Sequence, residues 1–139
     1  MFKNILVPVD LSEKNKRALE IAMEMAQTHK GAVRLLHVIE TLADTDFGEI
    51  KDFYSRLEKS AWKKLDALTQ PYQNQATEIS SQVAYGDRTT QILRFAGETG
   101  TDLIVMHSHR IRTDNPAQGW GTISYKVGIL SQCPVLLVK

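Results

Sequence analysis

The sequence has a single cysteine, Cys133, so no disulfide can form within its 139 residues. Such sparing use of cysteine is typical of proteins in a reducing compartment. The longest apolar runs span about five residues, far short of the roughly 18 that a membrane-crossing helix needs. The absence of both features favours a soluble, cytoplasmic protein without a membrane partner.

An excess of charge of one sign is also lacking. The chain has 17 Lys and Arg against 16 Asp and Glu, a formal net charge of +1. A surface so balanced overall does not favour nucleic acid as a partner, although local clusters still matter. The opening MFKNILVPVD has no small-residue cleavage pattern and is interpreted as a first strand, not a signal peptide. The length predicts one domain, residues 1–139.

Strand-like apolar runs alternate with segments whose apolar residues recur at helical spacing. These runs are 4–9, 32–38, 79–85, 103–106 and 135–138. The third run alternates polar and apolar residues, which predicts a less buried strand, an edge of the sheet. Such alternation of strand and helix predicts a doubly wound α/β domain: parallel strands joined by right-handed helical crossovers, with helices on both faces.

Two helix ends can be predicted from single residues. Ser12 is a suitable N-cap for the first helix, and Gly31 is a suitable left-handed cap at its end. His37 lies within a strand and is interpreted as a core histidine with a satisfied hydrogen bond. Cys133 precedes the last strand and is interpreted as a small buried hydrophobe.

Ligands of doubly wound sheets bind beyond the carboxyl ends of the strands. Asp10 ends the first strand, directly after Pro8 and Val9. Its carboxylate can accept hydrogen bonds from a ribose hydroxyl or an exocyclic amine. The alternative is that Asp10 only forms the turn before the first helix.

A loop over residues 107–120 is long for a compact domain, and such loops are usually functional or disordered. It leads through Gly119, Trp120 and Gly121 into Thr122 at a predicted helix start. Unpaired amides at a helix N-terminus attract anions, and the hydroxyls of Thr122 and Ser124 can add donors. This is a phosphate cradle in physical terms but a weak sequence motif, because it lacks a third glycine. The alternative is a simple turn and helix cap.

Four basic side chains open this loop: His107, His109, Arg110 and Arg112. They can clamp phosphates, or they form only a solvated charged surface. His-x-His can also ligate a metal, but no Cys or acidic pair stands at a useful spacing, so we predict no metal site. No catalytic arrangement of Ser, His and Asp or of Cys and His is visible, and we assign no catalytic residues.

The chain resembles the universal stress protein family. The resemblance is carried by "KNILVPVDLSEKNKRALEIA", "LLHVIE", "YGDRTTQILRFAGETGTDLIVMHSHR" and "GTISYKVGILSQCPVLLV", in the family's order and over nearly the whole chain. It implies a three-layer α/β/α sandwich with a five-stranded parallel sheet of order 3-2-1-4-5, a Rossmann-like fold of the adenine nucleotide alpha hydrolase type. It also implies a cytoplasmic homodimer, paired through the last strand, with a role in the stress response.

One branch of the family binds ATP with G-x-x-G, nine residues, then G-[ST]. By this resemblance, the adenosine pocket corresponds to Pro8, Val9, Asp10, Val38 and Met106, and the phosphate contacts correspond to Gly121, Thr122, Ile123 and Ser124. The first two glycines of the motif are replaced by His107 and Arg110, and ten residues separate Arg110 from Gly121. The "SHR" at 108–110 is similar to a subgroup that is still linked to adenine nucleotides.

These residues favour a universal stress protein that binds an adenine nucleotide, ATP or AMP, with or without Mg²⁺, as a regulatory ligand. One alternative is a dimeric interaction module that binds no nucleotide and contacts an unidentified protein through the loop with Trp120. A lower alternative is a slow ATP hydrolase, for which no carboxylate cluster is visible.

Overall fold

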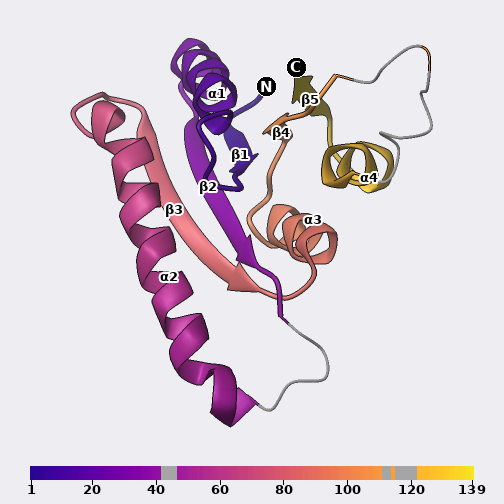
Figure 1. The fold of residues 1–139 in the computed structure, drawn as a ribbon. Helices are drawn as coiled ribbons and strands as arrows, with labels where there is room; N and C mark the ends of the chain where they lie inside the picture. Colours follow the sequence, from indigo (N-terminus) through magenta and orange to yellow (C-terminus); the bar gives the residue numbers. More distant parts are fainter. Residues whose placement is uncertain (42–46, 111–113, 115–121) are drawn as a thin grey trace.

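The computed structural model describes residues 1–41, 47–110, 114 and 122–139. Its centre is a five-stranded parallel sheet with strand order β3-β2-β1-β4-β5 (Figure 1). The strands are β1 Asn4–Pro8, β2 Ala32–Ile39, β3 Glu78–Tyr85, β4 Leu103–His107 and β5 Val135–Val138. The predicted fold class and strand order are therefore confirmed.

Helices cover both faces of this sheet (Figure 1). They are α1 Asn15–His29, α2 Phe47–Thr69, α3 Arg88–Glu98 and α4 Ile123–Leu130, with a short 3₁₀ helix at Gln70–Tyr72. Alternate residues of β1 serve the two faces, as the period of a strand requires. Ile5 and Val7 pack with α1 and α2, whereas Leu6 packs with α3 and α4. The central strand is thus buried on both sides, which explains its continuous apolar sequence.

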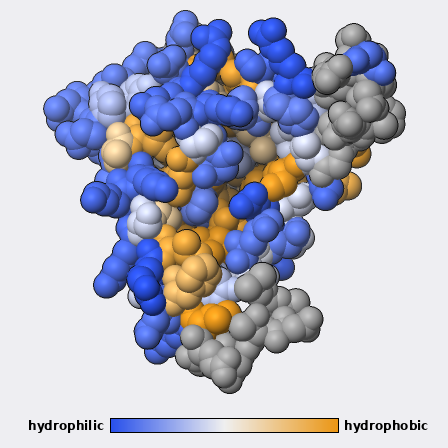
Figure 2. Space-filling model, viewed as in Figure 1, coloured by the Kyte–Doolittle hydropathy of each residue, from blue (hydrophilic) through white to orange (hydrophobic). Residues whose placement is uncertain are grey.

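The two edge strands are more exposed than the central ones. Polar, solvent-facing residues alternate with more buried ones along most of β3, which confirms that this strand lies at an edge. On β5 the Leu136 side chain is exposed, and Ile129 and Leu130 of the neighbouring α4 are exposed as well. Figure 2 shows one face of the molecule, where apolar side chains reach the surface between largely hydrophilic areas.

Both predicted caps of α1 are wrong in detail. Ser12 does not cap the helix; α1 begins at Asn15, and the Ser12 amide instead bonds to the Asp10 carboxylate. At the other end, Lys30 and not Gly31 takes the left-handed conformation, with φ 55°. Gly31 is needed for a different reason. A Cβ there would lie 2.8 Å from the Lys3 backbone, so glycine permits this close approach.

None of the described helices is long and apolar enough to cross a membrane. Several residues of the predicted loop, Arg112, Gly119, Trp120 and Gly121, lie outside the described residues. The structure around the phosphate cradle is therefore known from its flanks, the end of β4 and the start of α4.

Candidate functional site

A pocket of about 460 Å³ opens at the carboxyl ends of β1, β2 and β4, beside the N-terminal ends of α1, α3 and α4. This volume lies within the range of small-molecule sites, roughly 300–1,000 Å³. The lining residues are Pro8, Val9, Asp10, Lys14, Asn15, Leu36, Val38, Arg88, Ile92, Met106, His107, Ser108, His109, Thr122, Ile123 and Ser124. The pocket thus forms where a doubly wound sheet is expected to bind ligands.

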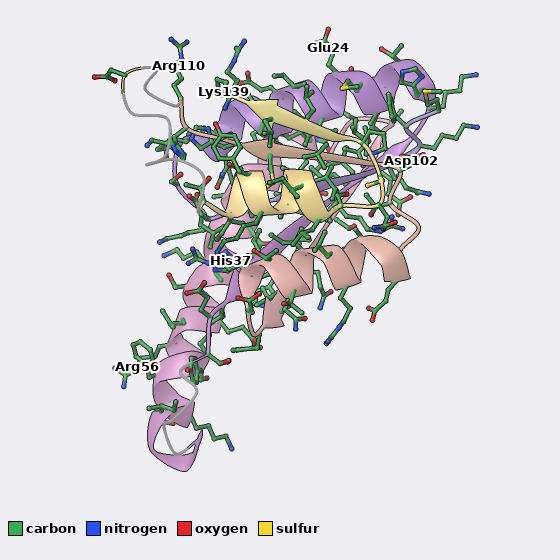
Figure 3. The ribbon with its side chains drawn as sticks, turned by 90° about the vertical axis from the view of Figure 1, so that its right-hand side faces the viewer. Glu24, His37, Arg56, Asp102, Arg110 and Lys139 are labelled. Atoms are coloured by element: carbon green, nitrogen blue, oxygen red, sulfur yellow. The ribbon has the colours of Figure 1, made fainter. Side chains whose placement is uncertain are left out.

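Most residues of the predicted site lie together in this pocket. Those that line it are Pro8, Val9, Asp10, Val38, Met106, His107, Thr122, Ile123 and Ser124. Arg110 does not line it; its side chain is exposed and projects away from the sheet (Figure 3). Gly121 lies outside the described residues. Predicted site residues from the ends of β1, β2 and β4 and from the start of α4, far apart in the chain, thus line one pocket.

The turn after β1 fixes the position of Asp10. The Ser12 amide donates to Asp10 Oδ1 at 2.9 Å, and the Leu11 amide donates to Asn15 Oδ1 at 2.8 Å. Leu11 has φ 68°, a left-handed conformation that is costly for a non-glycine residue. The buried Asn15 side chain compensates by binding the Leu11 amide directly. The exposed Asp10 carboxylate is consequently held on a well-defined turn at the mouth of the pocket.

Asp10 is ionised at neutral pH. Burial raises the pKa of its carboxyl, but the hydrogen bond from the Ser12 amide, the nearby Ser12 hydroxyl and the electrostatic effects of His107 and Arg88 lower it by more. The net effect is a pKa below the ordinary value of 3.8. A carboxylate in this state can only accept hydrogen bonds. It therefore suits donors such as the hydroxyl groups of a ribose or the N–H groups of an amine.

Backbone groups of β1 and β2 form the pocket wall next to Asp10. The Val9 amide donates to the Leu36 carbonyl at 2.9 Å, and the His37 ring nitrogen Nδ1 lies 2.9 Å from the Val9 carbonyl. Because a carbonyl only accepts, this contact requires the proton on Nδ1. His37, labelled in Figure 3, therefore has the predicted satisfied hydrogen bond, but it is half-buried and not a core residue. It locks the chain after β1 against β2, beside Val38.

At the opposite side of the pocket, hydroxyl groups from β4 and α4 meet. Ser108 and Ser124 are both buried, and Ser124 Oγ donates to Ser108 Oγ at 3.0 Å. Thr122 occupies the N-cap position of α4, and its hydroxyl lies 3.4 Å from Ser124 Oγ. This end of the pocket therefore offers hydroxyls beside the first turn of a helix, where the helix dipole favours an anion.

Positive charge surrounds the pocket beyond the predicted histidines. Lys14, at the start of α1, and Arg88, at the start of α3, both line it. Arg88 Nε also lies 3.5 Å from Glu40 Oε1 in an exposed ion pair. Among the described residues that line the pocket, Asp10 alone carries a negative charge. The site is thus suited to an anionic ligand that also presents hydroxyl groups.

Several lining residues stand in no recognisable sequence pattern. Asn15 lies five residues after Asp10 and contributes through a backbone contact that no motif specifies. Lys14 and Arg88 stand at helix starts and resemble ordinary surface charges. Ser108 lies in the "SHR" segment, but its hydroxyl contacts come from α4 and from the end of β5. Proximity in the fold, and not spacing in the sequence, identifies these residues.

Cys133 takes no part in the pocket. It is half-buried before β5, where Ser131 Oγ accepts from its amide at 3.1 Å and donates to its carbonyl at 2.9 Å. The prediction of a buried residue is therefore only partly correct. Among the described residues, no three or more His, Cys, Asp or Glu side chains gather in a way that could hold a metal ion.

The comparison with protein families identifies the chain. The model of the universal stress protein family matches residues 1–139. The chain belongs to this family. Universal stress protein YxiE of Bacillus subtilis is 28% identical over 149 residues, with all of both chains covered. The structure of UspA from Lactobacillus plantarum superposes with a TM-score of 0.80 at 24% identity, covering 99% of this chain and 98% of the other.

Two further family structures contain a bound ligand. One is described as a universal stress protein in complex with cAMP; its TM-score is 0.68 at 19% identity, covering 99% of this chain and 97% of that one. The other is a universal stress protein from Archaeoglobus fulgidus in complex with dAMP, with a TM-score of 0.71 at 20% identity and complete coverage of both chains. At these identities the superpositions establish a shared fold.

Proposed function

We propose that this universal stress protein binds an adenine nucleotide, AMP or ATP, as a regulatory ligand in the stress response. The observation that carries the proposal is the chemical asymmetry of the pocket. An ionised carboxylate, Asp10, stands at one end, and a hydroxyl pair, Ser108 and Ser124, stands at the other beside the start of α4. A nucleotide presents the matching groups, ribose hydroxyls and phosphate oxygens.

The adenosine part would lie between β1, β2 and β4. Its ribose hydroxyls donate to the Asp10 carboxylate, and the apolar side chains of Pro8, Val38 and Met106 contact the base. The backbone of Val38 offers the amide and carbonyl that can distinguish adenine by its edge. The hydrogen bonds of Asn15 and His37 hold this wall in place, so the pocket is formed before the ligand arrives.

The phosphates would lie toward Thr122, Ile123, Ser124 and the loop after β4. Hydroxyl donors, the N-terminal turn of α4 and the histidines His107 and His109 favour negative charge there. Arg110 and Gly121 are proposed as additional phosphate contacts. Arg110 lies outside the pocket lining, so it is expected to reach only the distal phosphates of ATP.

The ligands of the two superposed family structures support the proposed class of ligand. One holds cAMP and the other dAMP, and both are adenine nucleotides with a single phosphate. Both structures share the fold of this chain over nearly its whole length. A mononucleotide is therefore a reasonable first ligand to test, with ATP as the second.

We also propose a homodimer formed through β5. This strand is an edge of the sheet, and Ile129, Leu130 and Leu136 form an exposed apolar area on it and on α4. An unprotected edge with apolar side chains is a common surface for pairing. It also favours the second candidate function, a dimeric interaction module without nucleotide. Light scattering at micromolar concentration tests the dimer, and a monomeric mass contradicts it.

Native mass spectrometry of the purified protein, before and after addition of AMP or ATP, tests the nucleotide proposal. We expect a species whose mass is increased by one nucleotide per chain. A protein that stays free of nucleotide at millimolar AMP and ATP contradicts the proposal and supports the interaction module. Phosphate release in the presence of Mg²⁺, compared with buffer alone, tests the lower alternative of slow ATP hydrolysis.

A further inference from the structure

Lys139 directly follows β5 and does not line the pocket. Its ammonium group nevertheless contacts Ser108, which does line it. Its Nζ donates to Ser108 Oγ at 3.3 Å, to the His109 carbonyl at 3.2 Å and to the Tyr125 hydroxyl. The ammonium group also lies 4.6 Å from the centre of the Tyr125 ring. One side chain thus joins the end of β5, the residues after β4 and the first turn of α4.

These contacts limit what the Ser108 hydroxyl can do. A serine oxygen has two lone pairs and one proton. Ser108 Oγ receives one hydrogen bond from Lys139 Nζ and one from Ser124 Oγ, so both lone pairs are engaged. An ammonium group has no lone pair and can only donate, which fixes Ser108 as the acceptor of that contact. Toward a further partner, the Ser108 hydroxyl can therefore act only as a hydrogen-bond donor.

Within the described residues this proton has only weakly placed acceptors. The nearest is the His109 carbonyl, at a long 3.4 Å from Ser108 Oγ. That carbonyl already accepts from Lys139 Nζ and from the Tyr125 hydroxyl, each at 3.2 Å. Its two lone pairs are therefore occupied by closer donors. A strong acceptor in the pocket, which Ser108 lines, would take the Ser108 proton instead.

We propose that Ser108 is an obligatory hydrogen-bond donor to a phosphate oxygen of the ligand, and that Lys139 is the positioning residue that makes it one. The inference rests on the proposed nucleotide function and deepens it, because it assigns a phosphate contact to Ser108, the residue directly after β4. It also changes the role of Ser124. This hydroxyl donates to Ser108 and so acts through it.

Tyr125 reports on the same cluster. Its hydroxyl donates to the His109 carbonyl, and its ring packs edge-on against His109 at 5.8 Å between ring centres. The hydrogen bond from Lys139, with a smaller effect of the nearby Ser108 hydroxyl, lowers the pKa of Tyr125 below its ordinary value of 10.0. Removal of Lys139 should therefore raise the pKa of Tyr125, which ultraviolet titration can detect without any ligand.

The test is calorimetric titration of AMP, adenosine and inorganic pyrophosphate into the wild type, Ser108→Ala, Lys139→Met and the double variant. Pyrophosphate tests the anion end without the nucleoside. Lys126→Met is the matched control, because it removes the same charge from an exposed position on α4 outside the pocket lining. Urea unfolding of every variant checks that it folds.

We expect Ser108→Ala and Lys139→Met each to weaken AMP and pyrophosphate about tenfold, the usual effect of losing a hydrogen bond to a charged group. Adenosine should change less than about twofold, and Lys126→Met should behave like the wild type. Because Lys139 acts through Ser108, the double variant should lose no more than Ser108→Ala alone.

The inference is overturned if adenosine weakens as much as AMP, if neither variant affects AMP, or if the two losses multiply. A wild type that binds AMP with unaffected variants leaves the proposed function standing and removes only the role of Ser108 and Lys139. If the wild type binds pyrophosphate but neither AMP nor adenosine, the proposed nucleotide function is removed. The pyrophosphate affinities of Ser108→Ala and Lys139→Met then decide the inference. Binding of none of the three ligands overturns both.

Discussion

The two ends of the pocket are held by different kinds of hydrogen bond. At the end proposed for adenosine, each contact joins a backbone group to a side chain. The pairs are Leu11 amide with Asn15, Val9 carbonyl with His37, and Ser12 amide with Asp10. At the end proposed for phosphate, side chains from three separate elements meet at Ser108. The first end is therefore anchored to the backbone that continues from β1, whereas the hydroxyl contacts of the second join one side chain to another.

In the proposed site, a phosphate contact can form without the complete glycine pattern of the ATP-binding branch of the family. Close backbone approach needs glycine, but a hydroxyl donor held by a lysine does not. The contacts of Ser108 with Ser124 and Lys139 lie within the described residues, and none of them involves a glycine. The proposed phosphate contact thus rests on side chains and not on the glycine motif.

The largest expected effect comes from the carboxylate at the adenosine end. Asp10→Asn should weaken adenosine and AMP alike by about 100-fold, because two charge-assisted hydrogen bonds to ribose become weak ones. Calorimetric titration measures the loss. Asp66→Asn, an exposed carboxylate on α2, is the control and should bind as the wild type does. A loss confined to AMP would instead place Asp10 at the phosphate end.

Removal of the support beneath Asp10 should affect folding as well as binding. Asn15→Ala leaves the Leu11 amide without its partner in a left-handed turn, and we expect a loss of about 1–3 kcal/mol in the free energy of unfolding. Urea denaturation measures it, with the exposed Asn74→Ala as the matched control. Stability equal to that of the control variant would contradict the role of Asn15.

A smaller effect is expected at Arg110. Because it lies outside the pocket lining, Arg110→Ala should weaken ATP by about threefold to fivefold, as expected for an exposed ion pair, and leave adenosine unchanged. Parallel titrations with ATP, AMP and adenosine give the comparison. An equal loss for ATP and adenosine would remove Arg110 from the phosphate role.

The smallest effect concerns acid stability. Folding lowers the pKa of Asp10, so its ionised form stabilises the native state. That contribution is complete above the ordinary carboxyl pKa of 3.8 and is lost as the pH falls through the lower native pKa. The difference in unfolding free energy between the wild type and Asp10→Asn should be constant from about pH 7 to 5 and shrink below about 4. A difference that grows at low pH contradicts this sign.

Sequence reasoning reached the features that depend on local pattern. Buried strands, the exposed edge strand β3 and the position of Asp10 all follow from periodicity and from the rule that strand ends form sites. It failed where a contact joins distant residues. A serine shortly before a helix predicts an N-cap, but no sequence pattern indicates that the Ser12 amide binds the Asp10 carboxylate instead.

The cluster behind the phosphate end shows the same limit. Ser108 and Lys139 are 31 residues apart and meet only because β4 and β5 are neighbours in the sheet. Their residue types are common, and no spacing distinguishes them. Prediction of such a contact requires the strand order together with the register, which places His107 opposite Val138.

Calorimetric titration of adenosine, AMP and ATP into the same wild-type preparation tests the central claim most directly. We expect adenosine to bind, and AMP and ATP to bind more tightly because the phosphate end adds its own contacts. Binding of adenosine with no gain from phosphate would contradict the assignment of that end. No binding of any of the three at millimolar concentration would contradict the account of the pocket as a nucleotide site.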